Sequence, residues 1–251
     1  MLAAWRDWRD TRRVRKMGFT QAQWQAAVAG WPVLNRYSDQ ERQSLMALSF
    51  RFLARKSVVP GGDFQITDAM CLKVATMACV PILKLGLDWY NGWYTVILYE
   101  SAFVPNRPHR TPDGVVHPCG PVLSGEAWQQ GPVILSWEAV CHSGGASNVV
   151  IHEMSHKLDM RYQGANGAPP LHQGMRPQKW HDIFSKAFGE LQEDYRHHRP
   201  MPVDAYALTG PGEFFAVCSE AFFEAPDQLY QDWPDLYNLL ARFYRQGEKS
   251  L

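Results

Sequence analysis

The stretch NVVIHEMSHKLDMRY, residues Asn148 to Tyr162, decides the fold. It contains the pattern H-E-x-x-H, formed by His152, Glu153 and His156. Residues four apart in an α-helix lie one turn apart on the same side, so the two imidazoles point the same way. The stretch therefore predicts a helix that presents two histidines and a glutamate together.

A second face of the same helix is apolar. Ile151, Met154 and Leu158 follow an i, i+3, i+7 spacing, which is typical of a helix face packed on a core. Polar and apolar residues are thus separated around one helix. This separation favours a working site over two histidines that occur in a buried helix by accident.

Two imidazoles at this spacing can bind one zinc ion. Glu153 then lies beside the metal, where it can take a proton from a water molecule that the metal activates. A catalytic zinc also needs a third protein ligand and an open position. The motif therefore predicts half of a metal site.

Two familiar spacings for a third ligand fail. The metzincin pattern requires glycine and histidine where this chain has Asp159 and Tyr162. The other arrangement requires a glutamate about twenty residues further on. No glutamate occurs between Glu153 and Glu190, so that spacing is excluded as well.

The remaining candidates lie further along the chain. Glu213 and Glu220 are seven apart in an aromatic segment, where a buried carboxylate needs a partner. Their spacing does not decide between them, and His172 and His181 are also possible ligands. Asp159 either orients a ligand imidazole, or serves as a helix-end carboxylate or as a salt-bridge partner of Arg161.

Periodicity and capping signals predict the other elements. Helices are expected at 21–29, 38–55, 68–79, 180–197, 212–224 and 227–246. Strands are expected at 94–104, 115–117 and 133–137, and a loop over the site at 163–178. Strand 133–137 is either a sheet edge on which an extended peptide lies or an ordinary central strand.

The amino-acid composition restricts the classes of protein to which the chain can belong. The 251 residues are 46% hydrophobic with a formal net charge of +0, which predicts one sizeable core and argues against nucleic acid and membrane partners. Five scattered cysteines, no secretory signal and no long apolar run predict a cytoplasmic protein with reduced thiols. Residues 1–20 are locally basic and form either a partner- or membrane-surface helix or a solvated terminal helix.

The chain resembles a known family. VVIHEMSHKLDM (149–160) and DAYALTGPGEFFAVCSEAFFEAP (204–226) resemble the Mlc titration factor A family of zinc metallopeptidases. They are more distantly similar to the catalytic domain of anthrax lethal factor. The first resemblance extends from about Tyr37 to Phe243 and includes LGLDWYNGW, TVILYESAFV, DGVVH and WQQGPVILSW.

The resemblance implies roles for three further residues. In both groups a tyrosine precedes a ligand glutamate by seven residues, a pattern that Tyr206 and Glu213 match. Glu213 is then the third zinc ligand, and the Tyr206 hydroxyl stabilises the oxyanion. His117 in DGVVH is implied to reach the zinc conditionally and close its open position.

One departure concerns a second carboxylate. The lethal-factor pattern has it four residues after the ligand, where this chain has Val217. Its supporting role must then pass to Glu220 or Asp159.

The expected fold is α+β, a zincin-like metallopeptidase with a small β-sheet flanked by helices. We expect a basic segment at 1–20 and a single domain at 21–251. The expected function is a Zn²⁺-dependent, aminopeptidase-like peptidase that acts on peptides and is linked to a glucose-responsive transcriptional repressor, Mlc. The alternative is a zinc-stabilised module that sequesters such a regulator, with hydrolysis incidental.

Overall fold

A small sheet and many helices make a mixed α+β fold. The computed structural model describes residues 2–104, 109–110, 116–117, 123–162 and 164–247. Its first half contains α1 (Leu2–Met17), α2 (Gln21–Ala27), η1 (Pro32–Arg36), α3 (Asp39–Arg55), β1 (Ser57–Pro60), α4 (Asp68–Cys79), η2 (Leu87–Tyr90), β2 (Thr95–Tyr99), β3 (His109–Arg110) and β4 (Val116–His117). Its second half contains β5 (Gly125–Ala127), β6 (Val133–Ser136), α5 (Trp137–Cys141), α6 (Val149–Asp159), α7 (Pro177–Arg196), η3 (Ala205–Thr209), α8 (Pro211–Glu224), α9 (Pro226–Asp232) and α10 (Pro234–Tyr244).

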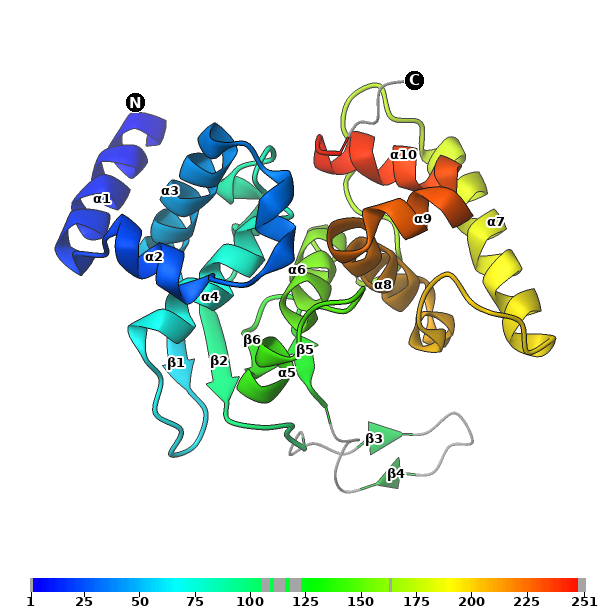
Figure 1. Cartoon of the computed structure of the whole chain (residues 1–251), viewed down its shortest axis with the longest axis horizontal. Coiled ribbons are helices and arrows are strands. Elements are labelled where there is room, and N and C mark those ends of the chain that lie inside the picture. The colour runs from blue at the N-terminus through cyan, green and yellow to red at the C-terminus, as the bar shows by residue number, and fades with distance from the viewer. Residues whose placement is uncertain (1, 105–108, 111–115, 118–122, 163, 248–251) are drawn as a thin grey trace.

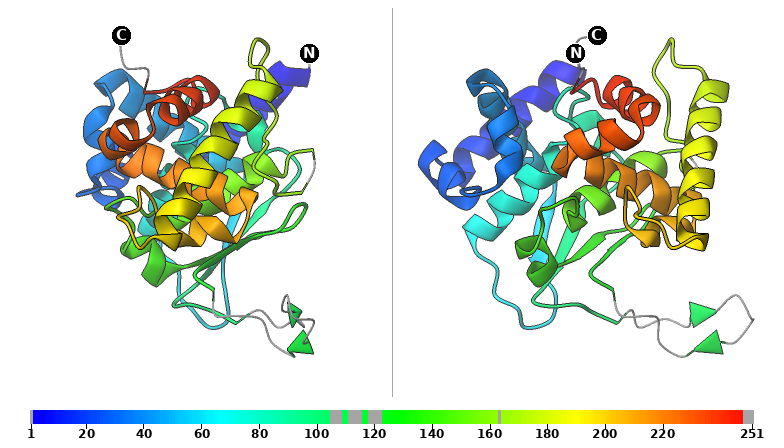
Figure 2. Two further views of the ribbon diagram at one scale, coloured as in Figure 1. Left: turned by 90° about the vertical axis from the view of Figure 1, so that its right-hand side faces the viewer. Right: turned by 45° about the vertical axis from the view of Figure 1, so that its right-hand side comes forward.

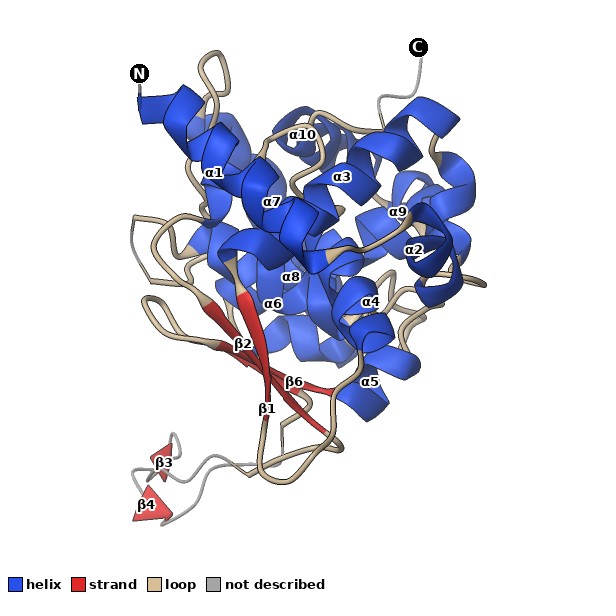
Figure 3. Cartoon of the chain, turned by 90° about the vertical axis from the view of Figure 1, so that its left-hand side faces the viewer, coloured by secondary structure: helices blue, strands red, loops and turns tan. Residues whose placement is uncertain are grey.

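The main sheet has four strands in the order β1-β2-β6-β5. Strands β1, β2 and β6 run parallel, and β5 runs antiparallel to β6. Figures 1 and 3 show this sheet along one side of the molecule, with most helices gathered on the other. Strand β6 lies between β2 and β5, so the hypothesis that 133–137 forms the sheet edge is wrong. The edge strands are β1 and β5, and β5 packs against α6.

Local capping signals predicted several helix boundaries correctly. The Ser38 hydroxyl accepts from the backbone N–H of Glu41, whose side chain accepts from Ser38 N in return, and α3 follows. Helix α4 has the predicted bounds, with Thr67 as its cap. These ends were predictable because each cap forms within four consecutive residues.

Two predicted elements differ from the structure. The strand predicted at 94–104 ends at Tyr99. The helix predicted at 227–246 is divided into α9 and α10 at Trp233, which precedes Pro234. A residue before proline is disfavoured in the α conformation, and proline has no N–H to continue the helix.

Helices α6 and α8 lie in the core. Helix α8 is buried from Phe214 to Phe223, and its aromatic side chains pack with those of α7 and α10. Figure 2 shows α7 along the outer side of this C-terminal half. Residues carried by α6 and α8 are thereby held by packing on both sides, which suits a site that must keep its geometry.

Two sequence expectations about thiols and membranes can be compared with the described residues. Cys71, Cys79, Cys141 and Cys218 are free cysteines, as expected for reduced thiols. Cys119 lies outside the described residues. Within the described part of the chain, no helix is both long and apolar enough to cross a membrane.

Candidate metal centre

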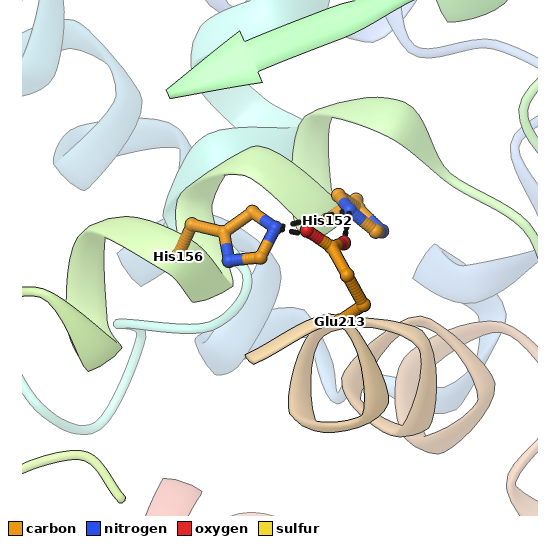
Figure 4. Close-up of side chains that lie close together, drawn as sticks. All are labelled: His152, His156 and Glu213. Atoms are coloured by element: carbon orange, nitrogen blue, oxygen red, sulfur yellow. Dashed lines mark hydrogen bonds and ion pairs between the residues drawn. The ribbon is translucent and has the colours of Figure 1, made fainter. Parts of the chain in front are cut away.

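Three side chains from α6 and α8 converge on one point (Figure 4). The Nε2 atoms of His152 and His156 are 3.2 Å apart, and Glu213 Oε2 lies 3.0 Å from the first and 3.1 Å from the second. Both histidines come from α6, and Glu213 comes from the first turn of α8. Among the described residues, these three form the one group of His, Cys, Asp or Glu side chains that could hold a metal ion.

The spacing of the three atoms suits a small cation. Zinc bonds of about 2.0–2.1 Å in tetrahedral geometry separate two ligand atoms by about 3.3 Å. The three distances between the ligand atoms, 3.0, 3.1 and 3.2 Å, come within a few tenths of an ångström of that value. Two imidazole nitrogens and one carboxylate oxygen also form a common donor set for zinc.

The proton on His152 supports the same conclusion. Glu220 Oε1 lies 2.7 Å from His152 Nδ1, and since a carboxylate only accepts, Nδ1 carries the proton. In the neutral ring, Nε2 then points a lone pair at Glu213 Oε2. Nε2 and Glu213 Oε2 at this distance require a positive charge between them, either a proton on Nε2 or a metal ion. A ligand histidine held through its other nitrogen by a carboxylate is a common arrangement at zinc sites.

The electrostatics of the cluster favour positive charge. Burial lowers the pKa of His152, but its hydrogen bonds with Glu213 and Glu220 raise that pKa well above the ordinary value. Burial raises the pKa of Glu213, yet hydrogen bonds with His152 and His156 lower it overall. Both shifts have the direction expected of a cluster that stabilises a cation.

Asn148 fixes α6 against α8. Its side-chain oxygen caps α6 by accepting from Val150 N and Ile151 N, both at 3.1 Å. Its backbone N–H donates to Glu220 Oε2 at 2.6 Å, and its Nδ2 donates to Glu224 Oε1 at 2.7 Å. Because Glu220 also holds His152, the cap of α6 and the orientation of the imidazole depend on the same carboxylate.

Glu153 lies beside the cluster in a tightly fitted position. Its side chain is buried, and its Oε2 has no hydrogen-bond partner among the described residues. Burial raises the pKa of Glu153. A Cβ atom at Gly125 would lie only 2.4 Å from Glu153 Oε1, so β5 can approach α6 this closely only with glycine at that position.

A cavity of ≈ 810 Å³ opens in front of these residues. His152, Glu153 and Glu220 line one side of it, and Tyr206 lines another. The Tyr206 ring lies 6.0 Å from the His152 ring and is half-exposed. Burial and the nearby carboxylate of Glu213 raise the pKa of Tyr206 to about 12, so its hydroxyl keeps its proton at neutral pH.

The other candidates lie elsewhere. His172 donates from Nε2 to the carbonyl oxygen of Phe243 at 2.8 Å, and His181 is exposed beside Asp182. His117 lies in β4, but its side chain is outside the described part of the chain.

Asp159 does not contact a histidine nitrogen. Its Oδ2 accepts from Gly167 N at 2.7 Å, and its Oδ1 has no hydrogen-bond partner among the described residues. The structure therefore agrees with the helix-end alternative, in which Asp159 holds the following loop. Of the two carboxylates considered for supporting a ligand, Glu220 is the one that contacts an imidazole.

Sequence reasoning missed two residues of the site. Asn148 precedes an apolar helical pattern, so it could have been recognised as a cap. Gly125 could not have been found, because its importance depends on a close contact with a distant helix.

Comparisons with known proteins agree with the geometry. A model of the family described as glucose-regulated metallo-peptidase M90 matches residues 5–245. Mlc titration factor A from Cronobacter sakazakii is 38% identical over 227 residues, which cover 89% of this chain and 85% of that protein. The proteins of the same name from Pectobacterium atrosepticum and Escherichia coli are 37% and 36% identical over 231 residues, each covering 90% of this chain and 87% of the relative. The resemblance found in the sequence is thereby confirmed, and the chain belongs to the glucose-regulated metallo-peptidase M90 family.

Proposed function

We propose that this chain is a zinc-dependent peptidase with a zincin-like site. The observation that carries the proposal is the convergence of His152, His156 and Glu213 beside a buried, unpaired Glu153. A site built only to hold a metal does not need that glutamate. The peptidase is assigned to 21–251 as one domain, with 1–20 as a basic N-terminal segment.

The metal would be held by His152 Nε2, His156 Nε2 and Glu213 Oε2. A zinc ion bound there supplies a Lewis acid that polarises the peptide carbonyl and lowers the pKa of a water molecule. Glu220 keeps the proton on His152 Nδ1 and so keeps the Nε2 lone pair directed at the metal position.

Glu153 acts as the general base. Its Oε2 has no hydrogen-bond partner among the residues that the structure describes, so it is available to accept a proton from the attacking water. Because burial raises the pKa of this carboxyl, Glu153 is a stronger base than an exposed glutamate. The same oxygen then passes the proton to the leaving amine.

Tyr206 stabilises the negative charge that develops on the carbonyl oxygen. Its ring lies beside His152 on the wall of the cavity, and its raised pKa keeps the Oη proton in place for donation. A hydrogen bond that strengthens as charge develops lowers the barrier of the reaction.

The substrate is a short peptide. Within the described strands β5 pairs only with β6, so its other edge can accept an extended backbone next to α6. A cavity of ≈ 810 Å³ has the size of a site for a small ligand. The family resemblance supports aminopeptidase-like action, which requires that peptides with a free amino terminus are cleaved faster than acetylated ones.

Removal of the metal tests the function. Treatment with a chelator should abolish cleavage of a short peptide, and one equivalent of zinc should restore it. Activity and bound zinc would be measured on the same samples. Cleavage that survives complete loss of zinc contradicts the proposal, and so does a zinc-loaded protein that cleaves no peptide.

A single methyl group at position 125 should disable the site. In Gly125→Ala the new Cβ displaces the Glu153 carboxylate, and a misplacement of about 1 Å can reduce the rate about 100-fold. Turnover, zinc content and the circular dichroism spectrum would be compared with those of Gly189→Ala, a position with nothing near the added atom. Equal activity in the two variants would show that the close fit is unimportant.

His117 is proposed to close the open position of the metal in a resting state, as the resemblance implies. Its replacement by alanine should preserve or raise peptide turnover while zinc stays bound. Zinc content and initial rate would be measured together. If His117→Ala loses both zinc and fold, the residue has a structural role instead.

The relatives' name, Mlc titration factor A, supports a second function. The chain would bind an Mlc-like repressor in the cytoplasm and withdraw it from its operators, with hydrolysis incidental. Glu153→Gln separates the two functions, because binding of a repressor should survive that change and peptide cleavage should not.

A further inference from the structure

Helix α1 divides its residues between two opposite faces. At about 100° per residue, both tryptophans and most cations fall within about 80° of Trp5, whereas both carboxylates and two apolar residues fall about 120° or more away. The α1 outer face consists of Trp5, Trp8, Arg9, Arg12, Arg15 and Lys16. Arg13 lies at the margin of this face and is set apart because its Nη1 donates to the carbonyl oxygen of Ala54 at 3.0 Å. The α1 inner face consists of Asp7, Asp10, Val14 and Met17.

The α1 inner face is docked on α3. Asp10 is fully buried, and its Oδ2 accepts from Arg55 Nε at 2.6 Å. Asp7 Oδ1 lies 2.6 Å from Arg51 Nη2, and Val14 packs against the core. Both carboxylates of the helix are therefore paired with arginines of α3, Asp10 in the interior and Asp7 at the surface, where its side chain is 62% exposed.

The α1 outer face carries cations and tryptophans, and all of these residues are exposed except Arg9, which is half-buried. Trp5 and Trp8 are each 57% exposed. The Arg9 guanidinium lies 5.2 Å from the Trp5 ring centre, and that of Arg12 lies 5.7 Å from the Trp8 ring centre. A single exposed aromatic residue is ordinary. Two of them in one row with four cations and no carboxylate form a pattern that is typical of helices lying in a membrane interface.

We propose that the α1 outer face docks on an anionic phospholipid surface. Tryptophan prefers the level of the lipid headgroups, and cations near an anionic leaflet gain binding energy from its phosphates. Figure 1 shows α1 at the outer margin of the molecule, beside α3. A row of side chains along a peripheral helix can touch a flat surface with all its members at once.

The net charge of +0 argued against a membrane partner, but it is a sum over all residues of the chain. That sum conceals the division within α1, where both carboxylates are paired with arginines of α3 and the cations of the α1 outer face lie on the other side of the helix. This inference is also independent of the proposed peptidase, since no residue of the α1 outer face lines the metal centre.

Two other partners fit the α1 outer face less well. A single-stranded nucleic acid binds by stacking its bases on aromatic rings along a groove. Here an arginine covers part of each ring, and the face is a convex row. An acidic protein would need a pocket that receives an anchoring side chain, and a convex row offers none.

Vesicle binding by the full chain tests the proposal. The protein would be sedimented with vesicles of phosphatidylcholine alone and with vesicles containing about 30% phosphatidylglycerol. We expect at least tenfold stronger binding to the anionic vesicles, and a marked loss at about 0.5 M salt because exposed charges are then screened.

Matched variants locate the binding face. Arg12→Glu with Arg15→Glu, and separately Trp5→Ala with Trp8→Ala, should each abolish the preference for anionic vesicles. The control pair, Lys179→Glu with Lys186→Glu on α7, changes net charge by the same amount at exposed positions and should bind as the unaltered chain does. Peptide cleavage should be equal in all of these proteins, and thermal unfolding would verify that each remains folded.

Several outcomes would overturn the assignment. Binding that is absent or equal for the two kinds of vesicle would reject it, as would equal losses in the α1 and α7 charge reversals. Tighter binding of a labelled single-stranded oligonucleotide through α1 would assign the face to nucleic acid. Tighter binding of polyglutamate would assign it to an acidic protein.

Discussion

Replacing Glu153 by glutamine should abolish peptide cleavage and leave zinc in place. Glutamine has nearly the same shape, so it can occupy the space beside Gly125, but its amide cannot accept and release a proton as a carboxylate does. Loss of a general base costs about 10²- to 10⁴-fold in rate. Turnover would be measured on a short peptide, with bound zinc determined on the same preparation.

Tyr206→Phe provides a graded comparison for this result. The variant loses one hydrogen-bond donor and keeps the base, so we expect turnover to fall about 10²- to 10³-fold with zinc unchanged. Full activity in Glu153→Gln would contradict the proposed mechanism. Full activity in Tyr206→Phe would contradict only the role assigned to the Tyr206 hydroxyl.

Loss of Glu213 should release the metal. Glu213→Ala removes the one carboxylate oxygen that lies near both Nε2 atoms, so both bound zinc and peptide cleavage should be lost. Zinc content after dialysis and turnover with added zinc would be measured. The circular dichroism spectrum would verify that α8 remains folded.

The matched variant is Glu220→Gln, two turns further along α8. Glutamine can still accept from His152 Nδ1 through its amide oxygen, but without the negative charge that strengthens the contact. We expect zinc affinity to fall about 10- to 100-fold, as for other residues that orient a metal ligand. Normal zinc content in Glu213→Ala together with complete loss of zinc in Glu220→Gln would show that Glu220, and not Glu213, is the metal ligand.

Much of the helical framework could be predicted from the sequence. The start of α3 and both ends of α4 follow from caps and breakers that act over a few residues. The H-E-x-x-H pattern likewise predicted the helix α6 and the common side of its two histidines. These features are local, so neighbouring residues determine them.

The choice between Glu213 and Glu220 could not be made from spacing. Seven residues span about two helical turns, so both side chains share one face of α8. Only the packing of α8 across α6 determines which carboxylate meets the Nε2 atoms and which meets Nδ1. The family resemblance favoured Glu213, and in the structure Glu213 is the carboxylate that lies near both Nε2 atoms.

The edge of the sheet could not be predicted for a similar reason. Strand β5 has three residues, which is too short for an alternating pattern, and its pairing with β6 is set by the fold. The need for glycine at position 125 comes from the close contact between β5 and Glu153, which the sequence does not reveal.

The proposed site holds one zinc ion between His152, His156 and Glu213. Anomalous diffraction at the zinc absorption edge, from crystals of the zinc-loaded protein, would locate that ion. We predict a single strong peak about 2.0–2.2 Å from His152 Nε2, His156 Nε2 and Glu213 Oε2. A zinc-loaded crystal with no peak between these three atoms, or with its zinc bound elsewhere in the chain, would show that His152, His156 and Glu213 do not form the zinc site.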